Sequence, residues 1–183
     1  MRILVVGISI LLGLVSVEAH AAGKIELHVS LSPVGSFVGK SENVSGQISL
    51  LPDSSIAGSN IGVSLDTFTT GIGLRDKHMK ETYFETQKFP SAVASIVQAA
   101  NGKFKANLKI RETEKVIEGT YKISGSDVQL EFQTRMSDFK IKKASYMGVG
   151  AENEVKVVAL VPAVKGQPPS APATAASQPP STR

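Results

Sequence analysis

The stretch KFKANLKIR at residues 103–111 alternates apolar side chains with basic or polar ones, and this alternation decides the fold class. Phe104, Ala106, Leu108 and Ile110 occupy the apolar positions. A β-strand points successive side chains to opposite faces, so these four residues share one face and the charged residues share the other. The stretch therefore predicts a strand with one dry side and one wet side.

The same two-residue period recurs along most of the chain. It is equally clear at residues 24–31 and 128–136, and weaker at residues 44–51, 61–67, 92–97, 115–123 and 155–161. A short segment at residues 36–39 adds one minor strand, and turn-forming pairs such as Asn101-Gly102 separate several of these segments. Only residues 74–84 suggest a helix, and that helix is short.

One-sided strands with short connections predict an antiparallel, all-β domain. Eight such strands bury their apolar face either by stacking two sheets or by closing a barrel, and alternation does not choose between the two. Several dry-face positions carry small residues, namely Gly46, Ala92, Ala94, Ala106, Gly119 and Ala159. Small residues leave room for a ligand inside a barrel. They also suit the taper of a filled barrel, so both interpretations stand.

The two ends of the chain predict export and a disordered extension. Residues 3–17 form an uncharged apolar run behind Arg2, and Ala19-His20-Ala21 places small residues where a signal peptidase requires them. We expect residues 1–21 to be a cleaved signal peptide, with cleavage after Ala22 as the close alternative, and the mature protein to be periplasmic or secreted. Residues 166–183 are rich in Pro, Ala and Ser and predict a disordered tail, which leaves one domain at residues 22–165.

The composition argues against most kinds of chemistry. The chain has no cysteine, which excludes disulfides, thiol catalysis and thiolate metal ligands. The two histidines of the mature chain, His28 and His78, fall on different elements, so no metal site is predicted. The formal net charge of +4 is mild and aromatic residues are few, which disfavours nucleic-acid binding. We therefore predict a binding protein rather than an enzyme.

Residues 66–80 hold the one polar cluster that a binding site would use. Arg75, Asp76 and His78 crowd the start of the predicted helix. An aspartate in a first helical turn interacts favourably with the helix dipole, so a capping and loop-anchoring network is one interpretation. The other is a rim that holds a polar headgroup at a barrel mouth. An acid–base pair of Asp76 and His78 lacks a nucleophile and an oxyanion partner, which leaves a hydrolase or isomerase without support.

The order of motifs around this cluster resembles the YceI-like family. The strongest likeness is in LDTFTTGIGLRDKHM at residues 65–79 and YFETQKFP at residues 83–90, with weaker likeness at residues 36–46, 107–117 and 137–141. Together the resemblance covers about residues 24–164. Two departures stand out. Residues 111–114 read Arg-Glu-Thr-Glu in place of a glycine-containing turn, and Tyr83-Phe84-Glu85 replaces a double phenylalanine followed by aspartate.

The resemblance implies a lipocalin-like, antiparallel eight-stranded barrel with one short helix. It also implies a periplasmic protein that binds a polyisoprenoid chain, such as an isoprenoid quinone or a polyprenyl lipid, in an apolar tunnel. The expected function is that of an exported, soluble lipid-binding protein for transport, storage or sensing. The alternative is a filled-barrel periplasmic interaction domain with no small-molecule ligand. No cofactor is expected beyond a bound isoprenoid lipid or quinone, and contact with a membrane or a membrane protein would serve ligand exchange.

Strand parity and the family motifs together select the candidate site residues. Parity predicts an apolar tunnel lined by Leu27, Val29, Phe104, Leu108, Leu130, Phe132 and Phe139. The motifs carry over to Asp66, Thr67, Arg75, Asp76, His78, Phe84, Phe89 and Pro90; Phe84 and Phe89 join the ligand-binding set, and the five polar residues form the tunnel rim or motif. Each buried methylene group contributes about 0.8 kcal/mol, so a long prenyl chain needs few polar contacts.

Overall fold

A computed structural model of the chain describes residues 23–146 and 148–166. The predicted signal peptide at residues 1–21 and all but the first residue of the predicted tail at residues 166–183 lie outside the described residues. Their structure therefore stays a prediction from the sequence.

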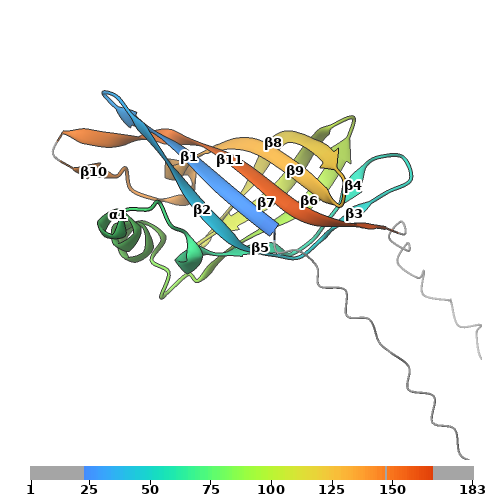
Figure 1. The fold of residues 1–183 in the computed structure, drawn as a ribbon, viewed down its shortest axis with the longest axis horizontal. Coiled ribbons are helices and arrows are strands. Elements are labelled where there is room, and N and C mark those ends of the chain that lie inside the picture. The colour runs from blue at the N-terminus through green and yellow to red at the C-terminus, as the bar shows by residue number, and fades with distance from the viewer. Residues whose placement is uncertain (1–22, 147, 167–183) are drawn as a thin grey trace, which may run out of the picture.

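Eight antiparallel strands close into a barrel (Figure 1). Strand β1 pairs with both β2 and β11, and this double pairing joins the two ends of the sheet. In their order around the barrel the strands are β1 (Gly23–Ser32), β2 (Ser36–Ser45), β5 (Ile61–Ser64), β6 (Ser91–Ala100), β7 (Lys103–Ile110), β8 (Thr113–Ser124), β9 (Asp127–Arg135) and β11 (Val149–Lys165). Closure confirms the eight-stranded antiparallel barrel and rules out the alternative of two stacked sheets.

Three further strands extend the sheet at the two ends of the barrel. At one end, β3 (Ile48–Leu50) runs parallel to the last residues of β11 and pairs with β4 (Ile56–Ala57). At the other end, β10 (Ser145–Tyr146) pairs with the start of β11. Figure 1 shows β3 and β4 at the end of the molecule opposite to β10 and helix α1 (Gly73–His78). The long strand β11 connects the two ends.

The boundaries near residue 46 differ from the sequence prediction. The predicted strand at residues 44–51 is divided, because its first residues complete β2 and its last ones form β3, which lies outside the closed ring. The break falls at Gly46, whose backbone has a φ of +90°. A Cβ atom there would lie 3.0 Å from the carbonyl oxygen of Asn60, so this bend requires glycine. The predicted minor strand at residues 36–39 is the start of β2, which is a full barrel strand.

The one predicted helix, at residues 74–84, forms in two parts. Helix α1 continues directly into a π-helical segment, η2 (Met79–Phe84). The segment ends at Glu85, which adopts a left-handed conformation with a φ of 53°. A short 3₁₀ turn, η1 (Leu65–Thr67), similarly replaces the end of the strand predicted at residues 61–67, and a second one, η3 (Met136–Phe139), follows β9.

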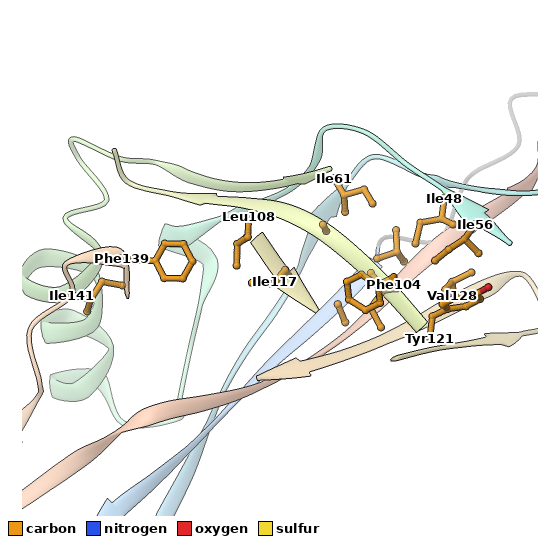
Figure 2. Close-up of a cluster of buried hydrophobic side chains, with 14 residues drawn as sticks. Ile48, Ile56, Ile61, Phe104, Leu108, Ile117, Tyr121, Val128, Phe139 and Ile141 are labelled. Carbon is orange, nitrogen blue, oxygen red and sulfur yellow. The ribbon is translucent and has the colours of Figure 1, made fainter. Parts of the chain in front are cut away.

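Buried side chains fill the end of the barrel that carries β3 and β4 (Figure 2). The Phe104 and Phe132 rings meet edge to face, with centroids 6.2 Å apart, and the Tyr121 hydroxyl donates to the Ser54 carbonyl oxygen at 3.0 Å. Gly119 makes room for this packing, because a Cβ atom there would lie 2.8 Å from the Phe104 ring. We call this packed region the plug and define it by seven buried residues: Ile48, Ile56, Phe104, Ala106, Ile117, Tyr121 and Val128.

Candidate functional site

An apolar cavity of about 720 Å³ occupies the barrel between the plug and helix α1. Seven of the eight barrel strands contribute side chains to its wall, and only β8 does not. Of the six small dry-face residues that the sequence analysis named, Ala92, Ala94 and Ala159 line the cavity, whereas Ala106 belongs to the plug and Gly119 accommodates its Phe104 ring. The small dry-face residues thus serve both purposes that the sequence left open: some leave space, and others allow close packing.

The cavity is closed at one end and opens at the other. The plug seals the inner end, where Ile48 and Val128 have no exposed surface at all. At the end that carries helix α1 several lining residues are exposed, among them Leu74, His78 and Val149. A ligand must therefore enter past the helix, and we call this opening the mouth.

Helix α1 and η2 present one face to the cavity. The face consists of Phe84, at the end of η2, and of six residues that recur at intervals of four: Leu74, Arg75, His78, Met79, Thr82 and Tyr83. The Arg75 guanidinium stacks over the Phe37 ring at 4.3 Å from the ring centroid. Further polar groups come from Thr134 and Arg135, at the end of β9, and from Ser145, at the start of β10. The mouth therefore carries polar and basic groups among exposed apolar ones, whereas the interior behind it is apolar.

Asp76 anchors the loop before the helix and does not line the cavity. Its carboxylate accepts hydrogen bonds from the Thr69 hydroxyl at 2.7 Å, and from the Thr70 hydroxyl and backbone N–H at 2.6 and 2.7 Å. Desolvation opposes ionisation of this group, but these hydrogen bonds, together with the charge of Lys80, lower its pKa below the ordinary value. His78 lines the cavity, so the two members of the conceivable acid–base pair do not face one space.

Asp66 and Thr67 are likewise local anchors. The Asp66 carboxylate accepts a hydrogen bond from the Ser64 hydroxyl at 2.6 Å. The Thr67 hydroxyl donates to the Ser64 carbonyl oxygen at 2.7 Å and lies 2.6 Å from the buried Ser41 hydroxyl. Of the five polar rim candidates, only Arg75 and His78 line the cavity.

Most of the apolar candidates lie on the cavity wall. The lining includes seven of the nine, namely Leu27, Val29, Phe84, Leu108, Leu130, Phe132 and Phe139. Phe104 instead belongs to the plug. The prediction placed it on the cavity wall because strand parity gives the face of a side chain but not its depth along the barrel. Phe89 lies outside the cavity wall, beside the Arg111 guanidinium at 5.3 Å and the Lys88 ammonium at 4.8 Å.

The two departures from the family pattern lie in contact with each other. Arg111, in the turn between β7 and β8, forms an ion pair with Glu85, at the end of η2. Arg111 also donates to the Lys140 carbonyl oxygen at 3.2 Å. The charged turn without glycine therefore ties the end of the helical segment to the loop after η3.

Several wall residues were missed by the sequence reasoning. Phe37, Met79, Val155 and Val157 all line the cavity. The two valines lie in the alternating segment 155–161, so strand parity alone places them on the apolar face of β11. Nothing local marks Phe37, since it belongs to the strand that was predicted too short.

The described residues contain no group of three or more histidine, cysteine, aspartate or glutamate side chains arranged to hold a metal ion. Within residues 23–146 and 148–166, no helix has the length and apolar character needed to cross a membrane.

Comparison with known proteins places these features in a family. The family model described as YceI-like domain matches residues 18–162. BcnA of Burkholderia cenocepacia superposes with a TM-score of 0.60 at 16% identity, covering 76% of this chain and 94% of that one. A polyisoprenoid-binding domain of Saccharophagus degradans, implicated in plant cell wall breakdown, superposes with a TM-score of 0.53 at 14% identity, covering 79% of this chain and 96% of that one. A search of curated proteins found no significant match.

Proposed function

Because this chain belongs to the family of YceI-like domains, we propose that it binds one long-chain isoprenoid lipid, a quinone or a polyprenyl lipid, inside the barrel. The observation that carries the proposal is the apolar cavity of about 720 Å³ that opens at the mouth. Single-ligand sites typically measure about 300–1,000 Å³. The likeness to a polyisoprenoid-binding domain supports the choice of ligand class.

The polarity of the cavity sets the orientation of the ligand. We propose that the prenyl tail points toward the plug, where the wall consists of aliphatic and aromatic side chains such as Leu130 and Phe132. The headgroup then lies at the mouth, within reach of Arg75, His78 and Arg135. These groups supply hydrogen-bond donors for a quinone carbonyl, a hydroxyl or a phosphate. Phe89 and Phe104 are not part of this proposed site, and Asp66, Thr67 and Asp76 support it as loop anchors.

Affinity in such a site grows with the length of the buried chain. Each buried methylene group contributes about 0.8 kcal/mol, and about 1.4 kcal/mol changes a dissociation constant tenfold. One additional isoprene unit, with five carbons, should therefore strengthen binding by well over tenfold until the cavity is full. This dependence distinguishes a chain-binding cavity from a surface that takes up lipid without selectivity.

The test is a titration of the purified, delipidated protein with farnesol, geranylgeraniol and solanesol, three prenyl alcohols of increasing length. Native mass spectrometry then counts the ligands bound to each protein molecule. We expect one ligand per protein and an affinity that rises with chain length and then levels off. Absence of uptake of all three alcohols and of ubiquinone would refute the proposal.

The filled-barrel interaction domain is the weaker candidate, because an open apolar cavity has no use in it.

We further propose that the domain at residues 22–165 acts after export to the periplasm, with residues 1–21 removed as a signal peptide; this rests on the sequence. Sequencing the N-terminus of the mature protein from a periplasmic extract tests it, and a retained Met1 or a cytoplasmic protein argues against export. Transport, storage and sensing all use the same binding step. Measuring ligand transfer between vesicles separates transport from the other two.

A further inference from the structure

The mouth of the barrel is surrounded by exposed apolar side chains from three separate segments. Ile72 and Leu74 flank the start of helix α1 and are 51% and 60% exposed. Val149, at the start of β11, is 40% exposed, and Val34, in the turn between β1 and β2, is 80% exposed. Figure 1 shows these three segments at the same end of the barrel. Exposed apolar groups gathered around an opening mark an interaction surface.

Most of the basic excess of the protein lies at this same end. The helical segment 72–84 carries three basic and two acidic residues, and segment 135–146 carries four basic and one acidic residue. The two segments together therefore carry a net charge of +4, which equals the formal net charge of the entire chain. Glu152, on the neighbouring strand β11, reduces this local excess by one charge but does not cancel it. The ion pairs Arg111–Glu85 and Lys88–Glu112, near the turn between β7 and β8, add no net charge.

The exposed lysines of these segments form no ion pair with a carboxylate of the described residues. Within the described part of the chain, the ion pairs that involve lysine use Lys24, Lys40, Lys88, Lys105 and Lys156, all outside the two segments. Lys77, Lys142 and Lys143 are exposed. Asp76, the acidic residue nearest the helix start, is already engaged by Thr69 and Thr70. The lysines are thus available to an external anion.

We propose that the mouth end of the barrel docks on the surface of an anionic lipid bilayer. Val34, Ile72 and Leu74 enter the headgroup region, while Lys77, Lys142 and Lys143 contact the lipid phosphates. The inference deepens the proposed function and rests on it. Because the cavity opens in the middle of this surface, a prenyl chain passes between bilayer and barrel without crossing water. The exposed apolar side chains match the apolar part of an anionic bilayer, and the exposed lysines match its phosphates. A bilayer therefore accounts for both features of this surface with one partner.

The test is cosedimentation with vesicles of phosphatidylcholine alone and of phosphatidylcholine mixed with phosphatidylglycerol. We expect binding to the anionic vesicles only. A variant with Lys142→Glu and Lys143→Glu should bind them at least about fivefold more weakly for each lysine replaced, because each change removes a positive charge and adds a negative one. Val34→Ser should also weaken binding. Matched controls are Lys103→Glu and Val97→Ser, which change an exposed charge on β7 and an exposed valine on β6, both at the plug end of the barrel near Phe104.

Solanesol binding is measured on the same proteins, because Val34, Lys142 and Lys143 do not line the cavity. These variants should bind solanesol normally but extract it more slowly from anionic vesicles. A protein that binds solanesol but not anionic vesicles overturns the docking proposal and leaves the proposed function intact. Vesicle binding that the mouth variants leave unchanged, or a dimer in solution whose contact covers the mouth, also overturns it. Vesicle binding lost in the mouth variants, in a protein that takes up no prenyl lipid, supports docking and refutes the proposed function.

Discussion

Filling the cavity from one wall should abolish ligand binding without harming the fold. Ala94 lies on β6, pairs with Ile61 and Leu108, and like them lines the cavity. In Ala94→Phe the new ring enters space that a ligand would otherwise occupy. The ring gains contacts with the cavity wall, so the melting temperature should stay the same or rise.

The size of the effect follows from the space that the ring occupies. A phenyl ring displaces roughly five methylene-sized groups of a prenyl chain, and at about 0.8 kcal/mol for each group the loss is about 4 kcal/mol. That loss corresponds to a dissociation constant about 1,000-fold higher. Ala159→Phe should act alike, because β11 lies four strands away from β6 in a ring of eight and thus on the opposite wall.

The assay is a solanesol titration followed by native mass spectrometry, with a thermal melt of each variant. Ala100→Phe is the matched control, since it adds the same ring at an exposed position of the same strand. It should bind solanesol like the unmodified protein. If Ala94→Phe and Ala159→Phe both fold and both keep full affinity, the ligand does not bind inside the barrel and the reasoning fails.

Three further predictions concern the stability of the barrel. Tyr121→Phe removes the donor to the Ser54 carbonyl and should lower the free energy of unfolding by about 1 kcal/mol in a urea titration; no change would mean that water replaces the hydroxyl at no cost. Gly119→Ala presses a methyl group against the backbone carbonyl oxygen of Glu131 and the Phe104 ring and should cost about 3 kcal/mol or more in the same assay, whereas Gly73→Ala, with nothing within 4 Å, should not. Asp76→Asn should lower stability at neutral pH. Because the pKa of Asp76 is lowered in the folded state, its contribution is complete above the ordinary value of 3.8 and disappears as pH falls through the folded-state value; a difference in unfolding free energy that is independent of pH would contradict this.

Alternation in the sequence was enough to predict the all-β class, because one dry face per strand is a local property. Closure was not predictable from alternation, since it depends on the pairing of β1 with β11, which lie at opposite ends of the domain. The family resemblance supplied the barrel, and the pairing confirms it. The sequence does not predict the break at Gly46, because a glycine in an alternating stretch is equally consistent with a small residue on the wall. Only its spatial neighbours, the backbone atoms of Asn60, distinguish the two.

The candidate site was predicted in its chemistry better than in its depth. Leu108 and Phe104 share a strand and a face, yet the first lines the cavity and the second belongs to the plug. Position along the barrel axis depends on strand tilt and register, which leave no local signal. The two departures from the family motif gave no sign of contact in the sequence, and only the fold brings Glu85 and Arg111 together.

The plug has a consequence for which molecules the barrel can tell apart. A cavity that is open at both ends would select chains by their total length. One that is sealed at its inner end measures only the terminal segment of a chain, since any excess extends out through the mouth. Such a barrel sets a minimum chain length but no maximum. It binds chains that are too short to fill it more weakly, and it binds all longer chains equally. Exchange must also proceed in a fixed order, with the tail entering first and leaving last.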